Sequence, residues 1–189
     1  MKIHAIDFYY EWMRVSKDIV MENKAVEMLN AAGYIPDKQK WTPPDNALYG
    51  VKDLLNLTKG QSEELFFKAI KHSFNHWYNN CEWYHRYCNE FDFKPRELRA
   101  STELVKIPLV SHRFYKTYLE GPDFAKWLSQ ICMVDFNLEF MKTNLSIDDI
   151  IDVLSKQGLY ASYSSGTSGR FSFIPKDWLT FIRSQYALG

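Results

Sequence analysis

The sequence has no excess of charge of either sign and no long hydrophobic run. Its 23 lysines and arginines are balanced by 23 aspartates and glutamates, which gives a formal net charge of zero at pH 7. Zero net charge removes the usual electrostatic argument for nucleic acid or an anionic membrane as a partner, although it leaves a local basic patch open. No stretch approaches the roughly 18 apolar residues of a membrane span. We therefore expect no nucleic-acid partner and no membrane span.

Cysteine is scarce, and two common motifs are missing. The chain has three cysteines, an odd number, and none of them forms a CxxC pair. This usage is typical of reduced thiols, and the N-terminal residues lack the apolar core of a signal peptide, so we expect a cytoplasmic protein. There is no GxxxxGK[ST] motif either, which excludes a Walker A loop.

Hydrophobic residues, in contrast, are plentiful. They make up 46% of the 189 residues, and aromatic residues alone make up 16%. This composition is typical of one folded domain with a sizeable core rather than a disordered chain. We expect a single domain over residues 1–189.

Helical periodicity dominates the first 158 residues. The clearest pattern spans Gln61 to Tyr78, and a second follows the pair Asn79-Asn80, so the two predict a helical hairpin. Residues 38–46, with their two prolines, are expected to be a loop. One long helix or two short ones are expected over residues 7–32, and further helices over residues 46–57, 111–119, 122–141 and 147–157.

The pattern changes to strand spacing near the C-terminus. Leu159, Ala161 and Tyr163 alternate with polar or smaller neighbours, and residues 171–173 alternate again. Pro175 is expected to begin a last helix that ends at Tyr186. The predicted fold class is therefore mostly α with a small antiparallel β-hairpin, an α+β arrangement in which residues 159–189 form strand, loop, strand and helix. An isolated two-stranded hairpin is marginal in water, so it needs more sheet or a bed of helices.

The segment between the two predicted strands is suited to binding phosphate. Glycine permits close backbone approach and positive φ, and hydroxyl groups add hydrogen-bond donors. Arg170 adds a guanidinium suited to phosphate oxygens. The alternative is a polar hairpin turn that binds nothing. The candidate site comprises Ser164, Ser165, Gly166, Thr167, Ser168, Gly169 and Arg170.

The sequence SSGTSG, residues 164–169, resembles the phosphate loop of AMP-forming adenylating enzymes, (S/T)SG(S/T)TG-x-P-K. Phe171 and Ser172 depart from the Pro and Lys that are common there. Residues 72–98 and 103–119 are similar to the N-terminal helical region of phenylacetate–CoA ligases and acyl-protein synthetases. Together the resemblance covers about residues 60–189.

This resemblance implies a ligase that uses ATP and Mg²⁺. The parent enzyme would activate a carboxylic acid as an acyl-adenylate and then transfer the acyl group to a thiol, either CoA or a protein acceptor. In that family the loop comes early, and the adenine-contacting segment, the ribose-binding acid and the catalytic lysine domain follow it. The chain is therefore expected to be an N-terminal fragment of an α/β adenylating domain, or a truncated relative, that is inactive alone. No catalytic residue is assigned.

Two other constellations of residues stay open. The first is a metal site or a Cys–His nucleophile pair on the helical hairpin, built from His72, His76, Cys81, His85 and Cys88. The second is a base-stacking surface, for which an aromatic helix core is the alternative interpretation. It would combine Tyr78, Trp83, Tyr84, Tyr87 and Phe91 with Lys94, Arg96 and Arg99.

Two hypotheses do not require catalysis. The chain could be a non-catalytic helical interaction module that retains a phosphate-type loop, or a helical metal-binding protein. A short sheet also has unpaired edges that can recruit another strand, so a homo-oligomer is possible.

Overall fold

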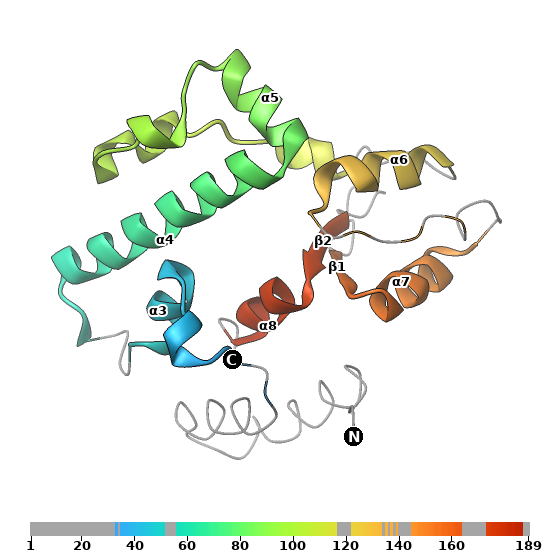
Figure 1. Cartoon of the computed structure of the whole chain (residues 1–189), viewed down its shortest axis with the longest axis horizontal. Helices are drawn as coiled ribbons and strands as arrows, with labels where there is room; N and C mark the ends of the chain where they lie inside the picture. Colours follow the sequence, from blue (N-terminus) through green and yellow to red (C-terminus); the bar gives the residue numbers. More distant parts are fainter. Residues whose placement is uncertain are drawn as a thin grey trace.

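A computed structural model describes residues 33, 35–51, 56–116, 122–133, 135, 137, 139, 145–163 and 173–186 of the 189-residue chain. The described part is mostly helical and contains one two-stranded antiparallel sheet, which confirms the α+β prediction (Figure 1). Its α-helices are α3 (Pro43–Tyr49), α4 (Lys59–Asn80), α5 (Glu82–Glu90), α6 (Pro122–Ile131), α7 (Ile147–Lys156) and α8 (Trp178–Tyr186). Its strands are β1 (Leu159–Tyr163) and β2 (Phe173–Asp177), and its 3-10 turns are η1 (Lys38–Lys40), η3 (Pro95–Glu97), η4 (Ser101–Lys106) and η5 (His112–Lys116).

The long helix α4 extends two residues beyond the predicted range at each end. Its N-terminus is closed by a capping box. The backbone N–H of Gln61 donates to Thr58 Oγ1 at 3.3 Å, and the backbone N–H of Thr58 donates to Gln61 Oε1 at 2.9 Å. A reciprocal pair of this kind satisfies two N–H groups that have no partner inside the helix. At the other end only Cys81 separates α4 from α5. The predicted helical hairpin is thus confirmed, with Cys81 as its connector.

One core lies between α4, α5 and the segment after α5. It consists of the buried residues Phe74, Cys88, Phe93 and Leu98. The rings of Phe74 and Phe93 stack with centroids 6.0 Å apart, and Leu98 is fully buried. Aromatic pairs at such distances add to the free energy gained from burial itself. This core fixes η3 and η4 against α4.

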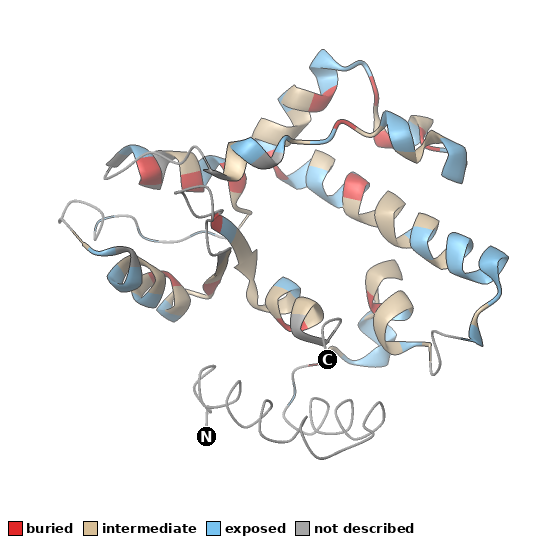
Figure 2. Ribbon diagram, turned by 180° about the vertical axis from the view of Figure 1, so that it is seen from behind, coloured by how far each residue is buried: buried red, intermediate tan, exposed pale blue. Residues whose placement is uncertain are grey.

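A second core lies under the sheet. Its buried members are Phe124 and Leu128 of α6, Leu154 of α7, Leu159 of β1 and Phe173 of β2. In Figure 1, α6 and α7 lie beside the hairpin, and α8 leads from β2 towards α3. Figure 2 shows buried positions of α6 and of the sheet in red, near the junction of these elements.

The ends of α7 agree with the sequence pattern. Ser146 and Asp149 form a capping box, since the Asp149 N–H donates to Ser146 Oγ and the Ser146 N–H donates to Asp149 Oδ2, each at 3.2 Å. Gly158 follows the helix with φ of +87°, a left-handed conformation that glycine adopts readily. The capping box and this glycine together set the length of α7.

Four predicted boundaries are wrong, and two of them involve proline. The helix predicted over residues 46–57 ends at Tyr49, with Gly50 as its C-cap. Pro43 begins α3 instead of lying in a loop, because its fixed φ suits the first helical position. Pro175 lies inside β2, and α8 begins only at Trp178. Among the described residues β2 pairs with β1 alone, so it is an edge strand, where proline is tolerated.

Helix α6 is also shorter than predicted, since it ends at Ile131 instead of near Met141. Beyond it, the backbone N–H and carbonyl of Asn137 form hydrogen bonds with the side chain of Gln157. The Asn137 N–H donates to Gln157 Oε1 at 2.6 Å, and Gln157 Nε2 donates to the Asn137 carbonyl at 3.2 Å. Gln157 thereby fixes this segment to the end of α7.

The helix expected over residues 111–119 is described only as the 3-10 turn η5. Its N-terminus agrees with the prediction, because the Arg113 N–H donates to Ser111 Oγ at 3.3 Å. Residues 7–32, 117–119 and 171–172, for which helix or strand is predicted, lie outside the described residues. Within the described part, no helix combines the length and apolar character that a membrane crossing requires.

Candidate functional site at the β1–β2 hairpin

The predicted phosphate-loop residues, Ser164 to Arg170, lie outside the described residues, but the strands on both sides of them are described. β1 ends at Tyr163 and β2 begins at Phe173, and these two residues are directly paired across the antiparallel ladder. The chain therefore leaves the sheet and re-enters it at the same place. The ends of the candidate segment are held side by side.

One face of this hairpin rests on the second core. Leu159 is 2% exposed and Phe173 is 3% exposed. The ring of Phe173 meets that of Phe124 edge to face, with centroids 5.2 Å apart. Burying a side chain of this size stabilises a fold by about 1.5–3 kcal/mol. The first residue of β1 and the first residue of β2 are thus both anchored in this core.

The opposite face packs against α8. The ring of Tyr160 lies 5.0 Å, between centroids, from both Trp178 and Phe181. Next to it, Lys176 Nζ donates to Ser184 Oγ at 3.0 Å, and burial lowers the pKa of this lysine. Helices therefore cover one face of the hairpin and the part of the other face next to α8, whereas Ile174, at the loop end of that second face, is 42% exposed. This packing supplies much of the helical bed that the short sheet needs.

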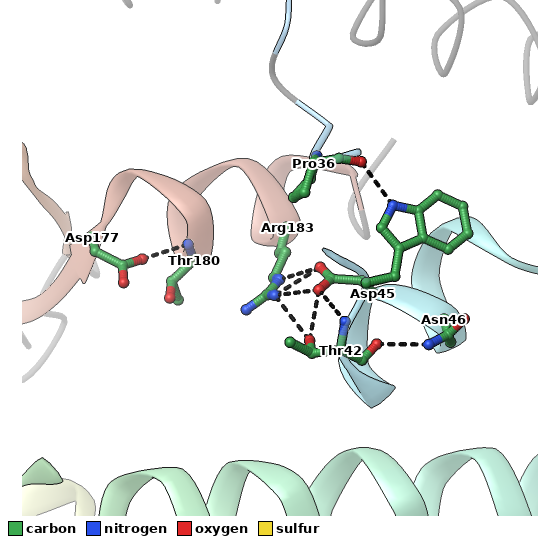
Figure 3. A network of polar contacts seen from close by, with 8 residues as sticks. Pro36, Thr42, Asp45, Asn46, Asp177, Thr180 and Arg183 are labelled. Atoms are coloured by element: carbon green, nitrogen blue, oxygen red, sulfur yellow. Dashed lines mark hydrogen bonds and ion pairs between the residues drawn. The ribbon is translucent and has the colours of Figure 1, made fainter. Parts of the chain in front are cut away.

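Helix α8 starts on a side-chain cap. Asp177, the last residue of β2, accepts a hydrogen bond from the Thr180 N–H at 2.6 Å (Figure 3). An aspartate at this position satisfies one free N–H of the first turn and suits the positive end of the helix dipole. The strand therefore passes into the helix with no intervening loop.

A buried ion pair then ties α8 to α3. Arg183 Nε donates to Asp45 Oδ1 at 2.8 Å, and Arg183 Nη2 donates to Asp45 Oδ2 at 2.7 Å. Nη2 also donates to Thr42 Oγ1 at 3.2 Å, while the Thr42 N–H donates to Asp45 Oδ2 at 2.9 Å (Figure 3). Asp45 is 1% exposed. A bidentate guanidinium–carboxylate pair is among the strongest polar contacts in proteins, so it fixes the direction of α8.

This network shifts the pKa of the carboxyl and of a nearby imidazole. Burial raises the pKa of Asp45, but hydrogen bonds from Thr42 and Arg183 outweigh it, and the pKa ends below its usual value. The pKa of His72 on α4 is lowered by burial first, and then by the charges of His76 and Arg183. Asp45 therefore stays ionised, and His72 favours its neutral form.

The His and Cys residues of the helical hairpin do not converge on a common point. The His72 and His76 rings stack with centroids 6.3 Å apart, whereas His85 Nδ1 lies 3.0 Å from the Tyr78 carbonyl. Cys81 Sγ donates to the Gln130 carbonyl at 3.7 Å. Among the residues that the structure describes, no three His, Cys, Asp or Glu side chains are grouped as metal ligands.

The suggested Cys88–His85 pair also lacks the features of a nucleophile. Cys88 is fully buried, and burial raises the pKa of its thiol. A raised pKa disfavours the reactive thiolate. Cys88 therefore serves the α4–α5 core as a small apolar side chain.

Most aromatic residues of α5 are engaged with one another. Trp83 stacks on Tyr87 with centroids 5.3 Å apart and on Phe114 at 4.8 Å, and Tyr87 meets Phe91 at 4.8 Å. The hydroxyl of Tyr84 donates to the Pro108 carbonyl at 2.9 Å. These contacts favour the interpretation of an aromatic packing layer.

The sequence interpretation missed Asp45, Lys176 and Arg183. Thr42 and Asp45 have the spacing of a capping box, which was a usable signal for the start of α3. No local pattern connects Asp45 with Arg183, because 138 positions separate them. Lys176 was assigned to a helix, so its place on the face of β2 that meets α8 was not foreseen.

No family model, no curated protein and no solved structure matches the chain. Any functional assignment therefore rests on the loop motif and on the geometry of its flanking strands.

Proposed function

We propose that this chain carries the ATP-phosphate-binding part of an AMP-forming acyl ligase of the phenylacetate–CoA ligase and acyl-protein synthetase type. The single observation that carries the proposal is the direct pairing of Tyr163 with Phe173, which brings both ends of segment 164–172 together. The resemblance implies a phosphate loop between two strands at this place. Without the motif, the same hairpin would be only a packed turn.

The strongest binding residues in this proposal are Ser165, Gly166, Thr167 and Gly169. Their backbone N–H groups and hydroxyls are the donors that a triphosphate accepts, and Ser164 and Ser168 complete the motif. Arg170 adds positive charge. With Mg²⁺, bound ATP supplies an α-phosphate that the carboxylate substrate can attack, with pyrophosphate as the leaving group.

The packed hairpin supports this role energetically. A phosphate loop binds well only if its ends are already fixed, because ordering a free segment costs conformational entropy. Here one face of the hairpin rests on α6 and α7, and Tyr160 on the other face packs against α8, which Arg183 ties to Asp45. The strands therefore present a preorganised base to segment 164–172.

A calorimetric titration of the full chain with Mg·ATP tests the proposal. We expect saturable binding, and we expect Arg170→Gln and Gly166→Val each to raise Kd by about tenfold or more, a loss of about 1.4 kcal/mol. Lys59→Gln is the matched control, because it also removes one positive charge and its side chain is 90% exposed on α4. Circular dichroism checks that each variant is folded.

Two outcomes would contradict the proposal. One is the absence of saturable Mg·ATP binding by the wild-type chain. The other is unchanged affinity in both loop variants, which would place the nucleotide elsewhere on the molecule.

A further inference from the structure

A pocket of about 350 Å³ lies between the second half of α4 and η3, away from the hairpin. We propose that it is a separate binding site for a phosphate group, carried either by a small phosphate ester or by a lipid headgroup. It is lined by Asn75, Tyr78 and Asn79 of α4 and by Lys94, Pro95 and Arg96. This site is independent of the proposed nucleotide loop.

The two sides of the pocket are held in place by the first core. Pro95 is buried, and the fully buried Leu98 donates its N–H to the Pro95 carbonyl at 3.2 Å. The Lys94 N–H donates to Glu97 Oε2 at 2.7 Å. Lys94 and Arg96 therefore project from a turn whose backbone is fixed, which reduces the entropy lost when a ligand binds.

The charge of the pocket is one-sided. None of its six lining residues is acidic, and the carboxylate of Glu97 is already engaged with the Lys94 backbone. Within the described part of the chain, the side chains of Lys94 and Arg96 have neither an ion pair nor a hydrogen bond. Two unpaired cations that line one pocket favour an anionic ligand.

A neighbouring pocket shows the contrast. It has about 300 Å³ and is lined by Phe93, Glu97, Arg99, Glu103 and Lys106. There two carboxylates balance two cations, and Lys106 Nζ lies 3.4 Å from Glu103 Oε1. This second pocket therefore provides internal controls, because it also has one lysine and one arginine but a balanced charge.

The polar side chains of the pocket between α4 and η3 are hydrogen-bond donors of the types that bind phosphate. The side-chain amides of Asn75 and Asn79, one helical turn apart on an exposed stripe of α4, offer N–H donors. The guanidinium of Arg96 can donate two parallel hydrogen bonds, and Lys94 adds a point charge. Phosphate oxygens only accept hydrogen bonds when fully ionised, so donors from both walls can bind one group.

Tyr78 adds a flat apolar wall. Its ring lies 4.2 Å from the His85 ring and meets Phe74 at 6.4 Å, and its hydroxyl donates to Asn89 Oδ1 at 3.3 Å. These contacts fix the ring beside the two cations. A phosphate ester with a planar or apolar substituent should therefore bind more tightly than inorganic phosphate.

The test titrates the full chain with inorganic phosphate and with phenyl phosphate while the side-chain amide signals of Asn75 and Asn79 are followed by NMR. We expect both signals to shift saturably, with a lower Kd for phenyl phosphate. Lys94→Gln and Arg96→Gln should each raise Kd by about fivefold or more, and Arg99→Gln should change it by less than about twofold. Asn79→Asp, at an exposed helical position, should abolish binding by adding a negative charge.

A second assay, with lipid vesicles, distinguishes a lipid headgroup from a soluble phosphate ester as the ligand. Co-sedimentation with phosphatidylcholine vesicles, with and without phosphatidic acid, should depend on Lys94 and Arg96 if the ligand is a lipid headgroup. Retention of phenyl phosphate binding without co-sedimentation identifies a soluble ester. Absence of both, or equal effects of Arg96→Gln and Arg99→Gln, overturns the proposal. Arg170→Gln must leave this binding unchanged, which separates the site from the nucleotide loop.

Discussion

Arg183 of α8 contacts both carboxylate oxygens of Asp45 in α3, at 2.8 and 2.7 Å, across 138 residues of sequence. The pair joins the C-terminal helix that follows the hairpin to the first described helix. Asp45 is almost fully buried, so the attraction between the charges is weakly screened by solvent. This contact is the main polar connection that we identify between the two ends of the described fold.

The first prediction concerns that ion pair. Arg183→Met leaves the Asp45 carboxylate buried without its cation, so we expect a loss of about 3 kcal/mol in the free energy of unfolding. Asp45→Asn should also destabilise the fold. The double variant should lose less than the sum of the two, because removing both charges leaves no unpaired ion. Urea unfolding of the four proteins measures the coupling.

Arg86→Met is the control for that experiment. Arg86 pairs with Glu82 at 3.5 Å on the surface of α5, and its side chain is 64% exposed. An exposed pair contributes about 0.5 kcal/mol or less. If Arg183→Met costs no more than Arg86→Met, the buried pair does not stabilise the fold.

A second prediction follows from His72. Its pKa in the folded protein is lowered, first by burial and then by His76 and Arg183, while Asp45 opposes the shift. A lowered folded pKa means that the unfolded chain binds the proton more tightly, so protonation favours unfolding. We expect stability to fall as the pH drops below about 6.5, the usual histidine value.

His72→Gln should flatten this dependence between pH 8 and pH 5.5. The measurement is the urea midpoint as a function of pH for the wild type and the variant. His76→Gln should keep most of the dependence, because it removes the smaller contribution of the His76 charge and leaves burial, the largest cause of the His72 shift, in place. An unchanged pH profile in His72→Gln would exclude His72 as the titrating group.

The third prediction concerns the two cores. Leu128 lies under the hairpin and Leu98 lies beside α4, and both are fully buried. Each leucine-to-alanine change should lower the free energy of unfolding by about 2–5 kcal/mol, since it removes apolar contacts and leaves a cavity. Chemical denaturation measures both values.

Val105→Ala serves as the reference for these variants, because Val105 is 87% exposed. Its effect should stay within about 0.5 kcal/mol. If either leucine variant is as stable as Val105→Ala, the corresponding core does not stabilise the described fold. Only Leu128→Ala should also weaken Mg·ATP binding, because only Leu128 supports the hairpin.

Local patterns predicted much of the fold correctly. Ser146 and Asp149 have capping-box spacing, Gly158 has a positive φ, and the alternation from Leu159 to Tyr163 is a strand. Each of these features depends on residues a few positions apart, so the sequence contains the whole physical cause. The helical hairpin of α4 and α5 was predictable for the same reason.

The errors arose where two structures suit the same residue. Proline fits both the first turn of a helix and an edge strand, so Pro175 alone does not distinguish them. The segment after α6 is bound at Asn137 by Gln157, which lies 20 residues further along the chain. The anchoring of α8 depends on Asp45, far away in the chain. For the candidate site, β1 was predicted correctly, but only Phe173 of β2 lay in the predicted strand, and the ion pair behind the hairpin was not predicted.

The pairing of β1 with β2 has a consequence for chain length. Leu159 faces the core under α6 and α7, whereas Tyr160 faces α8. One residue inserted into or deleted from either strand would exchange these two faces and move an apolar set out of its core. Natural variants should therefore change length between residues 164 and 172, and keep the number of residues in each strand constant.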